Sequence, residues 1–143
     1  MKKDDRVVAA LRTVSLFEGL DDAALARIAA QTKPFTFRAG ESVIDADSSG
    51  RFGRLYAVVS GTAEARIHDQ VVATFGPGDY FGEMSVLDGS PRSAGIVATS
   101  DMETFGLSAW NMRALLREEP GIAMHVIETL VARLRSQNES LSD

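Results

Sequence analysis

The sequence contains no cysteine, and its only histidines are His68 and His125. The lack of cysteine excludes disulfides, thiolate nucleophiles and cysteine metal sites, and it suits a reducing compartment. The longest uninterrupted apolar runs span only five residues, at 7–11 and 55–59, whereas a membrane-spanning helix needs about 20. No apolar segment follows the basic N-terminal residues, as a signal peptide would require. We therefore expect a cytosolic protein.

Positive charge and catalytic motifs are also scarce. The formal net charge is −5, and only three of the 15 basic residues are lysines, so the composition argues against a general nucleic-acid binder and favours arginine in any anion site. The two histidines lack partners at metal-ligand spacing, no serine lies in a nucleophile elbow, and no carboxylate pair stands out as acid and base. We expect no catalytic residue and no metal site.

Glycine is concentrated in the middle of the chain, since ten of the 12 glycines lie between Gly40 and Gly106. Short apolar runs recur there about every 8–12 residues with turn residues between them, which is typical of a β-sandwich or barrel. Clear hairpin loops are expected at 60–61 and 68–70. The expected strand runs are 35–37, 43–44, 55–59, 63–67, 71–75, 94–98 and 103–107.

The flanks of the chain have helical patterns. Asp21 and Ser108 are good N-caps, and the Pro120-Gly121 pair predicts a break before a helix over 121–135. The 143 residues therefore predict a single α+β domain. It has N-terminal helices in 1–33, a β-barrel in 34–107, C-terminal helices in 108–136 and a polar tail in 137–143 that we expect to fray.

The segment 81–94, FGEMSVLDGSPRSA, is the strongest candidate for binding chemistry. Gly82 lets the backbone approach a ligand, and the amides that open a short helical turn over 83–87 form a natural anion site. Arg92 can donate to two phosphate oxygens, and Glu83 can accept from a sugar hydroxyl. The alternative for Glu83 and Arg92 is that they pair with each other on the surface.

This segment resembles the phosphate-binding cassette of cyclic-nucleotide-binding domains. It departs from that pattern at Ser85, where the family usually has alanine or glycine, and at Val86, where leucine is commoner. Further stretches at 16–20, 37–41, 55–61 and 76–83 are similar to landmarks of the same family, so the resemblance covers almost the whole chain. The matching cassette positions are Gly82, Glu83, Met84, Leu87, Pro91, Arg92, Ser93 and Ala94.

The resemblance implies an eight-stranded antiparallel β jelly roll flanked by N-terminal and C-terminal helices. It also implies that Glu83 holds the ribose 2′-hydroxyl, that Arg92 neutralises the cyclic phosphate and that Ser93 donates to the phosphate or the base. The ligand would be cyclic AMP rather than cyclic GMP, and no other cofactor is expected. The implied ligand-binding residues are Gly82, Glu83, Met84, Ser85, Arg92, Ser93 and Ala94.

The resemblance implies a non-enzymatic regulatory module that acts on a separate protein partner through its last helix. We expect Val126, Leu130 and Leu134 to close over the purine as a lid, and the 123–134 face either to form a homodimer or to pack on the barrel. The chain alone is expected to bind neither nucleic acid nor membrane. Two alternatives stay open: a sensor fragment of a transcription factor similar to the cyclic-AMP receptor protein, and a jelly roll that binds another small anion or a protein.

Overall fold

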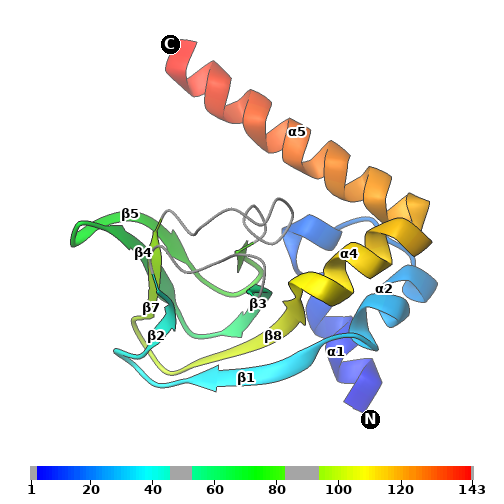
Figure 1. Cartoon of the computed structure of the whole chain (residues 1–143), viewed down its shortest axis with the longest axis horizontal. Helices are drawn as coiled ribbons and strands as arrows, with labels where there is room; N and C mark the ends of the chain where they lie inside the picture. Colours follow the sequence, from blue (N-terminus) through cyan, green and yellow to red (C-terminus); the bar gives the residue numbers. More distant parts are fainter. Residues whose placement is uncertain (1–2, 46–52, 83–93, 143) are drawn as a thin grey trace.

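The computed structural model describes residues 3–45, 53–82 and 94–142. A β-sandwich forms one end of the molecule, and a group of helices packs against the other end (Figure 1). The C-terminal helix leaves this group and extends away from the body of the domain (Figure 1). The arrangement confirms the predicted α+β class.

Two antiparallel sheets of four strands make up the sandwich, with strand orders β1-β8-β3-β6 and β2-β7-β4-β5. This confirms the predicted eight-stranded jelly roll. The strand β6 is the one that periodicity alone did not predict, because two residues are too short for an alternating pattern. The strands are β1 (Lys33–Phe37), β2 (Ser42–Ile44), β3 (Arg54–Ser60), β4 (Ala63–Ile67), β5 (Gln70–Phe75), β6 (Tyr80–Phe81), β7 (Gly95–Ala98) and β8 (Met102–Ser108).

The hairpin loops lie where turn residues predicted them. His68 and Asp69 connect β4 to β5 with φ of 51° and 67°, the left-handed pair that a tight hairpin requires. Gly61 connects β3 to β4 with φ of 85°, and a Cβ at this position would lie 2.2 Å from the carbonyl oxygen of Asp101. Only glycine fits there, because both the backbone angle and the close approach exclude a side chain.

The space between the sheets is filled by apolar and aromatic side chains. The ring of Tyr56 lies at its centre, with ring centroids at 5.9 Å from Phe35, 5.8 Å from Phe37 and 5.5 Å from Phe81. Such edge-on and tilted pairs add to the stabilisation by area burial. The buried members of this sandwich cluster are Ile44, Tyr56, Val58, Ala63, Ala65, Phe81, Ile96, Ala98 and Met102.

The helices pack around a second core, which also includes Leu55, Ala57 and Leu107 from the strands. The predicted caps are confirmed: the Asp21 carboxylate accepts from the amide of Ala24 at 2.8 Å, and the Ser108 hydroxyl accepts from the amide of Asn111 at 3.1 Å. The helices are α1 (Lys3–Arg12), the 3₁₀ turn η1 (Ser15–Phe17), α2 (Asp22–Ala29), α4 (Ala109–Glu118) and α5 (Pro120–Ser142).

The break before the last helix is confirmed at Glu119, whose φ of −125° and ψ of 82° end α4 before Pro120 opens α5. The helix then continues to Ser142, beyond the expected end at Arg135, and the fraying of the tail stays a prediction. The residues after Ser136 include no glycine or proline, so nothing local stops the helix. Within the described ranges, no helix combines the length and apolarity that crossing a membrane demands.

Candidate functional site

The predicted binding segment connects the two sheets. It follows β6, at the edge of one sheet, and precedes β7, inside the other. Phe81 is 3% exposed within the sandwich cluster, and the partly buried Ala94 packs against the same cluster. Both flanks of the segment are thus anchored in one core. Of the predicted ligand-binding residues, Gly82 and Ala94 are described, whereas Glu83, Met84, Ser85, Arg92 and Ser93 lie outside the described residues.

The approach to the segment is held by a tight set of backbone hydrogen bonds. Gly78 donates to the carbonyl of Val58 at 3.0 Å, and Val58 donates to the carbonyl of Asp79 at 2.9 Å. The Asp79 carboxylate also accepts from the amide of Gly76 at 2.8 Å. These bonds close the turn before β6 and fix the direction in which the chain enters the segment.

Gly82 is the first residue after β6 and has φ of 92°. This backbone angle lies in the region that glycine adopts and side-chain-bearing residues avoid. The sequence predicts that Gly82 lets the backbone approach a ligand, and its backbone angle in the structure provides the sharp change of direction that such an approach needs. The ligand role itself stays a prediction.

The three lid candidates Val126, Leu130 and Leu134 differ in how deeply they are buried. Val126 is 2% exposed and belongs to the helical core, together with Leu16, Phe17 and Ile122. Leu130 is partly buried against that core, and Leu134 is 56% exposed. Val126 therefore packs as part of the helical body in this arrangement, whereas Leu134 is exposed to solvent.

Sequence reasoning missed one link between α5 and the strand that leads into the segment. Arg133 donates from Nη1 to the Tyr80 hydroxyl at 3.3 Å, and its guanidinium carbon lies 5.7 Å from the centre of the Tyr80 ring. The two residues are separated by 53 positions in the chain. No local motif marks such a long-range pair, so only the fold could reveal it.

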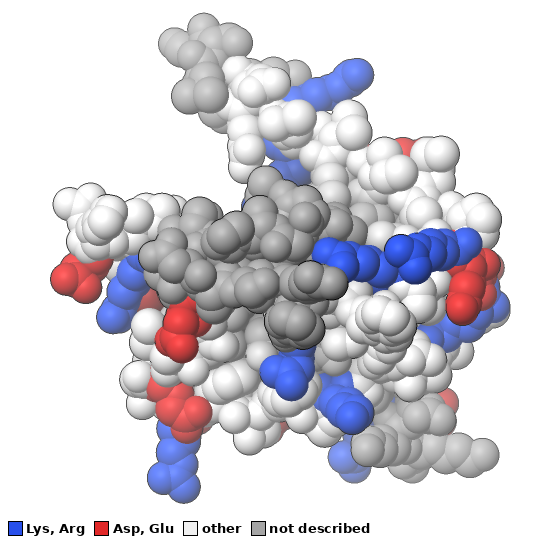
Figure 2. Space-filling view, in the orientation of Figure 1, with Lys and Arg blue, Asp and Glu red and all other residues white. Residues whose placement is uncertain are grey.

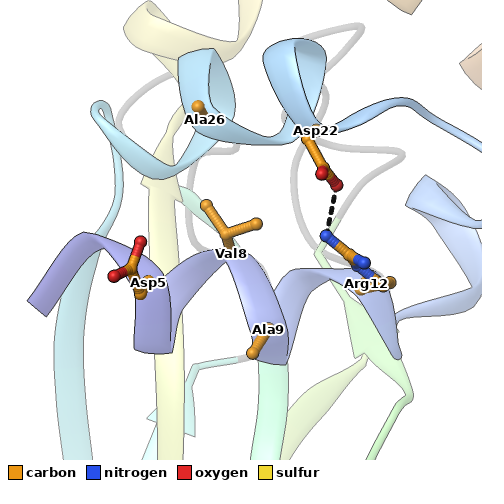
Figure 3. A pocket seen from close by; sticks show the side chains of 6 residues that line it. All are labelled: Asp5, Val8, Ala9, Arg12, Asp22 and Ala26. Atoms are coloured by element: carbon orange, nitrogen blue, oxygen red, sulfur yellow. Dashed lines mark hydrogen bonds and ion pairs between the residues drawn. The ribbon is translucent and has the colours of Figure 1, made fainter. Parts of the chain in front are cut away.

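One alternative anion site on the described surface is a pocket between α1 and α2. On the face drawn in Figure 2, basic side chains lie mainly at the centre right and below it, and acidic ones lie mainly toward the left and right margins. The pocket between α1 and α2 is lined by Asp5, Arg12 and Asp22, and Arg12 already pairs with Asp22 (Figure 3). Two carboxylates against one paired guanidinium make this pocket unfavourable for an anion.

The described residues also contain no group of three or more histidine, aspartate or glutamate side chains placed to hold a metal ion. This finding covers 3–45, 53–82 and 94–142 only. The candidate site stays the segment between β6 and β7 that the sequence predicts, and α5 contacts the strand before it through Tyr80.

A comparison with family models matches the description "Cyclic nucleotide-binding domain" over residues 34–119. The chain belongs to this family. The match begins in β1 and ends just after α4, so it includes both sheets and the segment between β6 and β7. The family that the cassette residues suggested is thereby confirmed.

The similar proteins include regulators whose names refer to cyclic AMP. A "CRP-like cAMP-activated global transcriptional regulator" of Mycobacterium tuberculosis is 28% identical over 138 residues, which cover 93% of this chain and 61% of that protein. The "Cyclic AMP receptor protein" of Thermus thermophilus is 39% identical over 92 residues, which cover 61% of this chain and 43% of that protein. The chain thus spans only part of the length of these relatives.

Solved structures agree with the fold. The N-terminal domain of a transcriptional regulator from Streptomyces coelicolor has a TM-score of 0.77 at 26% identity and covers 92% of this chain and 94% of that one. The catabolite activator protein of Thermus thermophilus has a TM-score of 0.77 at 31% identity and covers 90% of this chain and 62% of that one. Both structures align with most of this chain.

Proposed function

We propose that this domain is a cytosolic, non-enzymatic sensor of cyclic nucleotide, with cyclic AMP preferred over cyclic GMP, and that it signals through α5 to a protein partner. The observation that carries the proposal is the family match over 34–119, which includes a segment whose residues suit one phosphate and one ribose hydroxyl. The names of the relatives from Mycobacterium and Thermus support the preference for cyclic AMP.

In this proposal each ligand group has a partner from the segment between β6 and β7. Arg92 neutralises the cyclic phosphate with a charge-assisted pair of hydrogen bonds, and Glu83 accepts from the ribose 2′-hydroxyl. Ser93 and the backbone amides near Ser85 complete the phosphate contacts. The anchoring of Phe81 and Ala94 in one core supports this assignment, because fixed flanks reduce the ordering cost of binding.

Movement of α5 is the proposed output. The break at Glu119 provides a hinge, since one residue between two helices can absorb a change of backbone angles. Leu130 and Leu134, rather than the buried Val126, are the side chains that a tilt of α5 would bring toward a purine. The ligand would favour the tilted position by these added contacts, as any population shift requires.

The outward side of α5 also fits a second copy of the chain. Met124, Ile127 and Val131 are 55%, 53% and 43% exposed, and their spacing of three and four residues is the heptad spacing of a coiled-coil seam. We include homodimerisation through this seam in the proposal. Sedimentation equilibrium checks it: Ile127→Asp should give monomers at concentrations where the unsubstituted chain is dimeric.

A second candidate is that the domain is the sensor part of a longer transcription regulator. Its support is that the chain covers 61% of the Mycobacterium relative. Both candidates require the same ligand, so the deciding experiment for the proposed function is isothermal titration with cyclic AMP, cyclic GMP and linear AMP. We expect saturable binding of the cyclic nucleotides, tightest for cyclic AMP. Equal binding of linear AMP, or no binding at all, would refute the proposal.

A further inference from the structure

The helix α5 has a body-facing side and an outward side. Ile122 and Val126 are buried in the helical core, and Arg133 follows Val126 by seven residues, so all three lie on one face of the helix. Arg133 therefore continues the buried face beyond the point where apolar packing ends. Its side chain contacts the sandwich at this position instead of pointing away from the body.

The partner of Arg133 is placed on rigid backbone. Tyr80 pairs with Ala57 of β3, and the turn that precedes it is closed by the hydrogen bonds of Gly78 and Asp79 described above. The Tyr80 ring packs against the helical core, while the next residue, Phe81, is buried in the sandwich cluster. The short strand β6 thus contacts both cores of the domain.

Two weak interactions act together between these residues. The Arg133 guanidinium donates to the Tyr80 hydroxyl at 3.3 Å, and it also lies 5.7 Å from the ring centre, within the range of a cation–π interaction. At an exposed site such an interaction changes an equilibrium about two- to fivefold. This is too small to hold the fold together, but it is large enough to bias the position of the part of α5 that follows Leu130, which packs against the helical core.

We propose that Arg133 and Tyr80 form a latch that holds the middle of α5 close to β6, where the chain enters the segment between β6 and β7. Both are positioning residues. When the latch is closed, α5 already lies near the position that the nucleotide will occupy. Binding then requires less additional ordering of the helix. This effect on affinity rests on the proposed function, whereas the effect on α5 itself does not.

Hydrogen exchange in the ligand-free chain tests the latch directly. Arg133→Gln should raise the exchange rates of amides in 127–138 about two- to fivefold, and Tyr80→Phe should raise them less because it keeps the ring. The double variant should match Arg133→Gln alone, since one interaction cannot be removed twice. Arg135→Gln is the matched control, because it removes the same charge from the outward side of the same helix. The thermal unfolding midpoint should fall by about 4 °C at most.

The affinity for cyclic AMP is the second readout. Arg133→Gln should weaken it by about two- to fivefold, and Arg135→Gln should not. Unchanged exchange in Arg133→Gln, additive effects in the double variant, or the same effects in Arg135→Gln would each overturn the latch. If the unsubstituted chain bound no cyclic nucleotide, the proposed function would fail, and the exchange rates alone would still decide whether the latch exists.

Discussion

Substitution of Val126 by alanine separates a core role from a lid role in one experiment. Val126 is 2% exposed among Leu16, Phe17 and Ile122. The substitution removes two buried methyl groups at about 0.8 kcal/mol each, and incomplete collapse of the space adds a cavity cost. We therefore expect the free energy of unfolding of the ligand-free chain to fall by about 1.5–2.5 kcal/mol.

Urea denaturation of the ligand-free chain provides the measurement, since a single domain of this size is expected to unfold in one transition. The matched control is Val72→Ala, which removes the same atoms from a side chain that is 55% exposed on β5. That variant should stay within about 0.5 kcal/mol of the parent. If Val126→Ala left the unfolding free energy unchanged and weakened only nucleotide binding, Val126 would be a lid residue and its assignment to the core would be refuted.

Three further results are expected. Glu83→Gln should bind cyclic AMP more weakly and discriminate less against 2′-deoxy cyclic AMP in titrations; unchanged discrimination would leave Glu83 with a structural part only. Gly61→Ala should lower the free energy of unfolding by more than the roughly 1–3 kcal/mol that a left-handed alanine costs, because its Cβ would lie 2.2 Å from the carbonyl oxygen of Asp101. Gly40→Ala is the control, since Gly40 has the same kind of backbone angle but no close neighbour, and it should cost less. Equal urea midpoints for the two variants would contradict this. The chain, with its net charge of −5, should not shift duplex DNA at physiological salt with or without cyclic nucleotide, and a retarded band would disprove that expectation.

Features set by local chemistry could be predicted from the sequence. The caps at Asp21 and Ser108 depend on one side chain and an amide three residues away, and the hairpin at His68-Asp69 depends on two residues that tolerate positive φ. The family landmarks then implied the eight-stranded jelly roll, whereas the order of its strands came from the structure. These expectations required no knowledge of which surfaces meet.

Features set by tertiary contacts could not be predicted. The apolar stripe of α5 did not reveal that Val126 faces the helical core while Leu134 stays exposed, because a stripe indicates burial without naming the partner surface. The contact of Arg133 with Tyr80 joins distant parts of the chain. The cassette residues Glu83 and Arg92 are candidates by residue type and by family pattern, and their roles stay predictions.

The titration of an Arg92→Ala variant with cyclic AMP tests the central claim most directly. Loss of a charge-assisted pair of hydrogen bonds to phosphate should cost about 1.5–3 kcal/mol, or about ten- to a hundredfold in Kd. Arg117→Ala is the matched control, since Arg117 is an exposed arginine in the last turn of α4. We predict a large loss of affinity for Arg92→Ala, none for Arg117→Ala, and unchanged thermal unfolding for both. Titration curves for Arg92→Ala that overlay those of the unsubstituted chain would contradict the account.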